Sequence, residues 1–374
     1  MDEGSPESRS RRPLWSGQTP ARRDEPQAGD GAALRPLLSR LMRGENLSRA
    51  EASAMLESLL DTATTDAQIA AALVALAIKG ETVEELTGMA QVMRARARRI
   101  RSRHARFIDT AGTGSSHAKT FNVSTAAAFV IAGAGLAVAK HGGRAATSRS
   151  GSADVLTALG VNVQAAPEQS EDCLNDLGIC FMFAPLYHGA TARVAGVRRE
   201  LGVHTTFNLL GPLTNPAGAP RQLIGVWHAA LAEPLARALA ALGTEHAWVV
   251  HGQDGLDEVT LDGNTLVAEA HAGSSIKTFE VGPQDFGLRR ASLEGLRGGD
   301  AEANARMIRS VLTGARRDEA RDLVVANAAA ALFVGGAGES LHEAARLAEK
   351  SIDSGAAQGM LDRLVEATNK QIDK

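Results

Sequence analysis

The sequence predicts an α/β protein with a small N-terminal helical domain and a larger α/β domain that has a mostly parallel central sheet. Three observations favour this fold. Helical patterns fill residues 34–98, helix and strand patterns alternate from Arg106 onward, and aromatic residues are only 3% of a chain that is 44% hydrophobic. Alternating strands and helices are typical of βα units, whose parallel strands are buried on both faces. The length of 374 residues is sufficient for two domains.

The first 31 residues differ in composition from the rest of the chain. They are rich in Ser, Pro and Gly and carry charges of both signs, and they lack the apolar run of a secretory signal. We therefore expect residues 1–31 to form a disordered tail. Elsewhere in the chain, no run reaches the roughly 18 apolar residues that a membrane-spanning helix needs.

Charge and cysteine content narrow the class of protein. The formal net charge of -3 argues against a nucleic-acid-binding protein, because such proteins usually present a basic surface. The two cysteines, Cys173 and Cys180, have neither CxxC nor zinc-knuckle spacing. We expect both to be reduced thiols in a cytoplasmic protein.

The helical domain is predicted over residues 32–100, as about four helices joined by short links. Three helix starts have the spacing of a capping box: Ser48 with Glu51, Thr65 with Gln68, and Thr82 with Glu85. The run IAAALVALAIKG ends at Gly80, a residue type that favours helix C-termini. We expect a further helix, at about residues 188–202, to pack on this domain.

The α/β domain is predicted over residues 101–374. Buried strand patterns occur at residues 106–112, 136–142, 161–163, 179–183, 221–227 and 246–252, with helical patterns between them. Shorter β segments with turns are expected between residues 257 and 281, and helices dominate from residue 300 onward.

The first of four polar stretches is DTAGTGSSHAKTFNVST, residues 109–125, in which a strand leads through glycines into a helix. Gly112 and Gly114 allow close backbone approach, and the small polar residues lie at a helix N-terminus, which attracts anions. The stretch is not a Walker A loop, because GxxxxGK[ST] is absent. Taken alone, it predicts either a phosphate site or an ordinary capped βα loop.

The second stretch, KHGGRAATSRSGSAD, covers residues 140–154 and also follows a strand. Lys140 and Arg144 complement phosphate charge, and nearby Ser and Thr hydroxyls can donate hydrogen bonds to phosphate. A solvated basic loop is the alternative. Because a second loop of the same sheet also suits anions, phosphate binding is favoured.

The remaining two stretches are VRRELGVHTTFNLLGPLTNPAG, residues 197–218, and HGQDGLDEVTL, residues 251–261. The former predicts a long loop that is either functional or a connector between domains. In the latter, Asp254, Asp257 and Glu258 follow a strand and provide the oxygen ligands that Mg²⁺ shares with substrate phosphates. A polar turn is the alternative. Together the four stretches predict a substrate with several phosphates, bound with magnesium.

These motifs, in this order, closely resemble those of the anthranilate phosphoribosyltransferase family, over most of the chain from about residue 34. The resemblance implies a nucleoside-phosphorylase-like fold of the class III phosphoribosyltransferases and a homodimer joined through the helical domains. It also implies the second step of tryptophan biosynthesis, in which the amine of anthranilate displaces pyrophosphate from C1 of phosphoribosyl pyrophosphate (PRPP). The product is N-(5-phosphoribosyl)anthranilate.

The resemblance also implies the site residues. PRPP would contact Gly112, Ser115, Ser116, Thr120, Asn122, Val123, Ser124, Thr125, Lys140, His141, Gly142, Gly143, Arg144, Ala145, Ala146, Thr147, Ser148 and Ser152. Anthranilate would contact Gly112, His141, Gly143 and Arg198, and two Mg²⁺ ions would be ligated by Ser124, Asp257 and Glu258. No covalent nucleophile is required, and no residue is assigned as the proton acceptor.

Two positions depart from the family pattern. The usual GTGGD is GTGSS here, with Ser115 and Ser116, whose hydroxyls can still bind phosphate. The usual KHGNR is KHGGR, so Gly143 replaces an asparagine that helps contact anthranilate. The loss of one hydrogen bond is worth about 1 kcal/mol. This departure concerns the identity of the amine more than the type of reaction.

Three other functions remain as alternatives. One is phosphoribosyl transfer to a different aromatic amine, and another is phosphorolysis of pyrimidine nucleosides on the same fold. The paired carboxylates argue against phosphorolysis, because they suit a pyrophosphate leaving group. A non-catalytic nucleic-acid-binding protein is the third, and the net charge argues against it.

Overall fold

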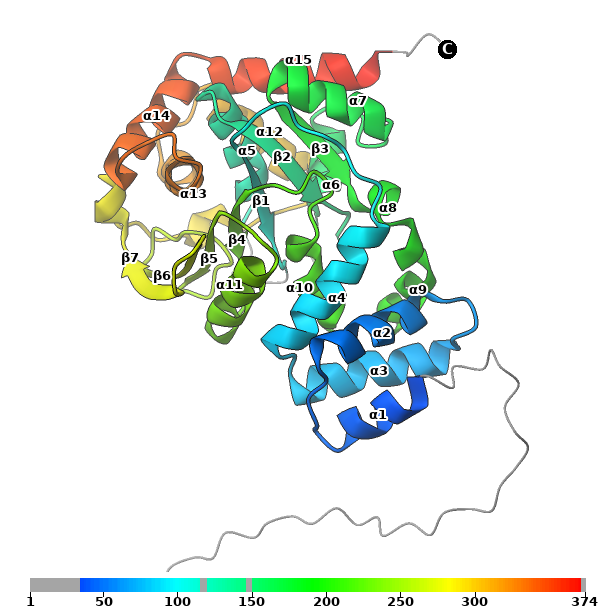
Figure 1. The fold of residues 1–374 in the computed structure, drawn as a ribbon. Coiled ribbons are helices and arrows are strands. Elements are labelled where there is room, and N and C mark those ends of the chain that lie inside the picture. The colour runs from blue at the N-terminus through cyan, green and yellow to red at the C-terminus, as the bar shows by residue number, and fades with distance from the viewer. Residues whose placement is uncertain (1–33, 115–119, 146–149, 371–374) are drawn as a thin grey trace, which may run out of the picture.

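The computed structural model describes residues 34–114, 120–145 and 150–370. Helices α1 (Leu34–Met42), α2 (Arg49–Leu60), α3 (Asp66–Lys79) and α4 (Val83–Arg96) lie together, and α9 (Ala192–Leu201) packs against α2 and α3 (Figure 1). The predicted tail, residues 1–31, lies outside the described residues. Within those residues, no helix is sufficiently long and apolar to cross a membrane.

The predicted capping boxes of the helical domain are confirmed. The side chains of Ser48, Thr65 and Thr82 each accept a hydrogen bond from the backbone amide three residues later. The side chain at that later position accepts a hydrogen bond from the backbone amide of the capping residue. Helix α3 ends at Gly80, whose φ is +80°. Glu85 has a second role, because its buried carboxylate also accepts hydrogen bonds from the Leu47 amide and the Lys79 ammonium, both at 2.8 Å. This carboxylate ties α2, α3 and α4 together.

Seven strands of the described chain form one sheet in the order β3-β2-β1-β4-β5-β6-β7. Its members are β1 (Phe107–Gly112), β2 (Ala137–Gly142), β3 (Ile179–Phe183), β4 (Arg221–Gly225), β5 (His246–Gly252), β6 (Thr265–His271) and β7 (Lys277–Val281). The pairs from β3 to β5 are parallel, and β6 and β7 are added antiparallel. The predicted mostly parallel sheet is confirmed.

Helices cover both faces of this sheet (Figure 1). They are α5 (Val123–Gly133), α6 (Ser152–Ala158), α7 (Pro167–Asp172), α8 (Ala184–Tyr187), α10 (Thr206–Leu213), α11 (Ala232–Ala241), α12 (Ala301–Leu312), α13 (Glu319–Val334), α14 (Leu341–Asp353) and α15 (Ala356–Asn369). A π-helical turn, Cys173–Leu177, continues α7. The two cysteines are buried and free.

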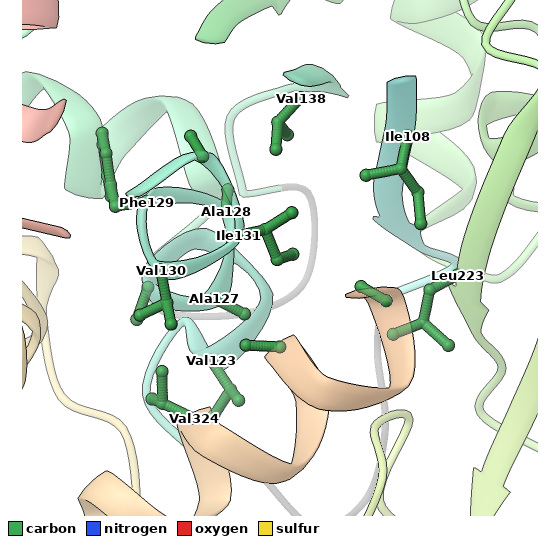
Figure 2. Close-up of a cluster of buried hydrophobic side chains, with 14 of the residues drawn as sticks. Ile108, Val123, Ala127, Ala128, Phe129, Val130, Ile131, Val138, Leu223 and Val324 are labelled. Atoms are coloured by element: carbon green, nitrogen blue, oxygen red, sulfur yellow. The ribbon is translucent and has the colours of Figure 1, made fainter. Parts of the chain in front are cut away.

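The alternation of side chains along the central strands divides the core in two. Leu223 and Trp248 belong to a cluster with α5 and α12 to α15, whereas Ile224 and Val249 belong to one with α10, α11 and the helical domain. Figure 2 shows the first cluster, in which Val123, Ala127 and Ile131 of α5 lie among residues from the sheet and from α13. The sheet is thus buried on both faces, so polar groups converge at its ends.

Two predicted elements are wrong. Residues 161–163 form no strand, because Val161 and Val163 are buried in a turn whose Asn162 bonds to Thr368 near the end of α15. Residues 197–218 are not one long loop, since α10 occupies their centre. At the start of α10 the Asn208 amide donates to the Thr205 carbonyl at 2.8 Å, and the Thr205 amide donates to the Asn208 side-chain oxygen at 3.1 Å.

Candidate active site

A polar cavity of about 300 Å³ lies at the carboxyl ends of β2, β1, β4 and β5. Ligands of open α/β sheets bind in this position. The cavity is lined by Ala111, Gly112, Thr113, Gly114, Thr120, Phe121, Asn122, Ser124, Thr125, Lys140, His141, Gly142, Gly143, Arg144, Ala145, Ser150, Gly151, Ser152, Asn208, Asp257 and Glu258. The first, second and fourth of the predicted stretches therefore meet at one site. The third stretch contributes one lining residue, Asn208.

The first loop is attached to β4. The Thr113 amide donates to the Gly225 carbonyl at 2.9 Å, and the Trp227 amide donates to the Thr113 hydroxyl at 3.2 Å. Asn122, at the start of α5, donates to the Ser150 carbonyl at 3.2 Å and so connects the first and second loops. Ser115 and Ser116, the first departure from the family pattern, lie outside the described residues.

Lys140 presents a buried ammonium at the base of the cavity. Its Nζ donates to the Thr110 carbonyl and lies 3.4 Å from the Ser124 hydroxyl. Burial lowers the pKa of Lys140, and the charges of Asp109 and Glu258 oppose that shift. A cation that is shielded from solvent attracts an anionic ligand more strongly than the same cation in water does.

The loop after Lys140 is closed by a carboxylate. Asp154 accepts hydrogen bonds from the Arg144 guanidinium at 2.8 Å, the Ala145 amide at 2.9 Å and the Gly151 amide at 3.0 Å. These bonds bring the two ends of the loop together over the N-terminus of α6. Ala146, Thr147 and Ser148, which are predicted PRPP ligands, lie outside the described residues.

The two glycines of KHGGR have different surroundings. A Cβ atom on Gly142 would lie 2.2 Å from the Ser152 Oγ and 3.1 Å from the Phe181 ring, so a side chain here would displace Ser152 and crowd Phe181. A Cβ atom on Gly143 would meet no heavy atom within 4 Å. The backbone therefore tolerates a side chain at Gly143, where the resembling family has asparagine.

Two carboxylates face the basic loop from the end of β5. Glu258 accepts a hydrogen bond from the Ser124 amide at 3.1 Å, and burial together with the charge of Asp257 raises its pKa. Asp254 does not line the cavity. It accepts bonds from the Leu256 amide at 3.2 Å and the Thr260 hydroxyl at 2.8 Å, and so shapes the turn.

His141 and His188 form a buried pair with ring centroids 5.1 Å apart. Burial lowers the pKa of His141 to about 3 and that of His188 to about 4, so both rings are neutral at pH 7. Within the described chain, neither Nε2 atom has a hydrogen-bond partner. His141 lines the cavity, and its Nε2 atom is buried.

Two predicted site residues do not line the cavity. Val123 is buried as the first residue of α5. Arg198 lies on α9, with its guanidinium carbon 5.1 Å from the centre of the Phe207 ring. Burial lowers the pKa of Arg198. The arginine is thus on the helical-domain side of α10 rather than at the base of the cavity.

Several polar residues near the site were not predicted. Asp109 and Asn215 are buried beneath it, Asn208 lines it, and Asn327 of α13 holds both the amide and the carbonyl of Val259 at 2.9 Å. One signal was available in the sequence. A charged residue inside the apolar strand FIDTAG must have partners, because an unpaired buried charge is costly.

Comparisons with known proteins agree with this geometry. The glycosyl transferase family, a/b domain, matches residues 104–358, and the helical bundle domain of that family matches residues 35–97. The anthranilate phosphoribosyltransferase of Rubrobacter xylanophilus is 50% identical over 337 residues, which cover 90% of this chain and 98% of that protein.

Solved structures are also similar. The anthranilate phosphoribosyltransferase of Thermus thermophilus is 41% identical, with a TM-score of 0.83 over 89% of this chain and 99% of that one. The Saccharomyces cerevisiae enzyme in complex with PRPP and Mg is 27% identical, with a TM-score of 0.81, and in complex with 4-fluoroanthranilate it is 25% identical, with a TM-score of 0.79. Each covers 91% of this chain and 99% of its own. The chain belongs to the anthranilate phosphoribosyltransferase family.

Proposed function

We propose that this protein transfers the 5-phosphoribosyl group of PRPP to the amine of anthranilate, with release of pyrophosphate. The observation that carries the proposal is the convergence of the Lys140 ammonium, the Ser124 hydroxyl and the Asp257 and Glu258 carboxylates on one cavity. Similar enzymes have been solved with PRPP and Mg and with 4-fluoroanthranilate. A polyphosphate with its metal needs this combination of charges.

The residues present fit magnesium shared with a substrate. Within the described residues, no group of three or more His, Cys, Asp or Glu side chains is arranged to hold a metal by itself. Glu258 accepts a hydrogen bond from the Ser124 amide at 3.1 Å and Asp257 lines the same cavity, and Mg²⁺ is commonly bound by one or two carboxylates together with substrate phosphates. Burial and the charge of Asp257 raise the pKa of Glu258, and a bound cation would oppose that shift. We propose two ions, held by Ser124, Asp257 and Glu258.

The mechanism follows from the distribution of charge. Mg²⁺ held by Ser124, Asp257 and Glu258 would neutralise charge on the pyrophosphate leaving group. Lys140 supplies buried positive charge at the cavity, where little water competes, and the exposed Arg144 lines the same cavity while bonded to Asp154. The backbone at Gly142 allows close approach of phosphate. The ribosyl carbon becomes oxocarbenium-like as the bond to pyrophosphate breaks, and the amine needs only to be positioned beside it.

The amine is assigned to the side of the cavity near His141. We propose Gly112, His141 and Gly143, which all line the cavity, as its contacts there. Arg198 would bind the carboxylate of anthranilate from the helical-domain side.

We also propose a homodimer and a cytoplasmic location. Val74 and Ile78 of α3 and Met42 of α1 are exposed by 36%, 82% and 81%, which is unusual for large apolar side chains in one small domain. A second copy of the helical domain would cover them. The free, buried thiols of Cys173 and Cys180 suit a reducing compartment.

The test is pyrophosphate release measured with PRPP, Mg²⁺ and a panel of aromatic amines. We expect release that depends on both PRPP and anthranilate, with one pyrophosphate per anthranilate consumed. Pyrophosphate release with another amine but not with anthranilate would overturn the proposed substrate and support phosphoribosyl transfer as the reaction. Production of free base from a pyrimidine nucleoside and inorganic phosphate, without pyrophosphate release, would replace the proposal by phosphorolysis.

A further inference from the structure

The backbone hydrogen-bond ladder between β1 and β2 is interrupted beneath the active site. The paired positions of these strands are Phe107 with Ala137 and Ile108 with Val138, and the pairing does not extend beyond them. On their other sides the strands remain paired to their ends, β1 with β4 as far as Gly112 and β2 with β3 as far as Gly142. The pairing is therefore interrupted only between β1 and β2, at the end of these strands that faces the cavity.

Where the ladder is interrupted, side chains form hydrogen bonds with the backbone groups of β1 and β2. The His141 amide donates to the Asp109 carboxylate at 3.1 Å, and the Ala139 carbonyl accepts from the Asn215 amide group at 2.8 Å. The Thr110 carbonyl accepts from the Lys140 ammonium. In a continuous parallel ladder such groups bond to the adjacent strand, and buried backbone groups rarely lack a partner.

Asp109 and Asn215 are joined to each other as well. The Asn215 amide group donates to the Asp109 carboxylate at 2.7 Å, and its oxygen accepts from the Ala217 amide at 2.9 Å. The exposed fractions of Asp109 and Asn215 are 0% and 4%, so neither can contact a ligand directly. This pair, which we term the wedge, connects β1, β2 and the turn after α10.

We propose that the wedge is a positioning device for PRPP: Asp109 and Asn215 replace the ladder bonds between the ends of β1 and β2 and fix the two ends relative to each other, so that Lys140 and the His141–Gly143 backbone face the pyrophosphate. Without the wedge, the His141 amide and the Ala139 carbonyl would have to form hydrogen bonds with β1 or with water. Either change would move the loop that begins at Lys140. The wedge also gives a role to Asn215 in the TNPAG turn, which the transfer chemistry does not otherwise use.

The test compares Asn215→Ala and the isosteric Asp109→Asn with a control of equal burial, Thr87→Ala. Thr87 is fully buried in α4 and donates to the Val83 carbonyl at 2.7 Å, so its removal costs stability in the helical domain and leaves the wedge intact. Steady-state KM values for PRPP and for anthranilate are measured, together with calorimetric binding of magnesium pyrophosphate. Asp109→Asn keeps the size of the side chain, and it decides the question if Asn215→Ala does not fold.

In both wedge variants we expect the KM for PRPP to rise about tenfold or more, and the affinity for magnesium pyrophosphate to fall by a similar factor. The KM for anthranilate should change less than about threefold. Thr87→Ala should lower the unfolding temperature and leave both the KM for PRPP and the affinity for magnesium pyrophosphate unchanged. Wild-type KM and pyrophosphate affinity in the wedge variants, or an equal loss in the control, would overturn the inference.

The inference rests on PRPP being the substrate, and the experiment separates the two claims. If the wild-type protein is active and the wedge variants match it, only the wedge fails. If the wild-type protein neither binds magnesium pyrophosphate nor turns over PRPP, the proposed function and the wedge fail together.

Discussion

A Cβ atom on Gly225 would lie 1.7 Å from the carbonyl oxygen of Asp257. The end of β4 thus needs a residue without a side chain, so that the loop carrying the two carboxylates can pass directly over it. The same glycine accepts the Thr113 amide through its carbonyl, at 2.9 Å. Gly225 therefore connects the phosphate loop and the proposed metal loop at one point of the backbone.

Replacing Gly225 with alanine should displace this metal loop. We expect Gly225→Ala to destabilise the protein by about 1–3 kcal/mol, as overpacking does, and to lower kcat/KM for PRPP by about tenfold or more. Gly359→Ala in α15 is the matched control, because no heavy atom lies within 4 Å of its added Cβ. Denaturant unfolding and steady-state kinetics check both. Normal kinetics in Gly225→Ala would show that the close approach has no role.

The adjacent glycines of KHGGR should respond differently to alanine. In Gly142→Ala the new methyl group collides with Ser152 and Phe181, so we expect PRPP binding to weaken by about tenfold or more. Gly143→Ala has open space and should stay close to wild type. Gly143→Asn should raise the apparent affinity for anthranilate, since one added hydrogen bond is worth about 1 kcal/mol. An unchanged or weaker affinity would contradict the assigned position of the amine.

The two carboxylates should be separable from the stability of the fold. Because burial and Asp257 raise the pKa of Glu258, a neutral glutamine there should leave the unfolding temperature unchanged or raise it. Turnover should nevertheless fall by about a hundredfold or more in Glu258→Gln and in Asp257→Asn. The control is Asp254→Asn in the same loop, which should retain activity. Activity retained in Glu258→Gln would exclude the metal role.

Each buried histidine should lower stability in mild acid, whereas Asp109 and Glu258, whose pKa values are raised to about 6 and about 8, act in the opposite direction. The folded-state pKa values of His141 and His188, about 3 and about 4, lie below the ordinary value near 6.5. The unfolded chain therefore binds protons that the folded protein does not, and stability present above pH 6.5 is lost as the pH falls toward 4. His188→Gln removes one such group, so its unfolding free energy should fall less between pH 6.5 and 5, by about 1–2 kcal/mol. Parallel pH curves would contradict this.

Local sequence patterns predicted the parts of the molecule that depend on neighbouring residues. The capping boxes at Ser48, Thr65 and Thr82 involve residues three positions apart, and all are present. The strands that alternate with helices also formed as predicted. The failed strand at residues 161–163 was too short to be decided by its own pattern, and its surroundings are set by Thr368, about 200 positions away.

The sequence predicted those site residues that lie within short contiguous motifs. Lys140, Ser124 and the Asp257–Glu258 pair meet as expected, because parallel strands bring their following loops to one edge. The bond between Asp109 and Asn215 joins residues 106 positions apart, so neither motif predicts it alone. Arg198, which the resemblance implies as a contact of the anthranilate carboxylate, packs on Phe207 and does not line the cavity.

The central claim is that this cavity joins the ribosyl carbon of PRPP to the amine of anthranilate. Anthranilate is fluorescent, and its fluorescence in the presence of the protein, PRPP and Mg²⁺ tests that claim most directly. The account predicts a steady loss of the signal as N-(5-phosphoribosyl)anthranilate forms, and no loss when PRPP or Mg²⁺ is left out. A constant signal at high concentrations of protein and of both substrates would contradict it.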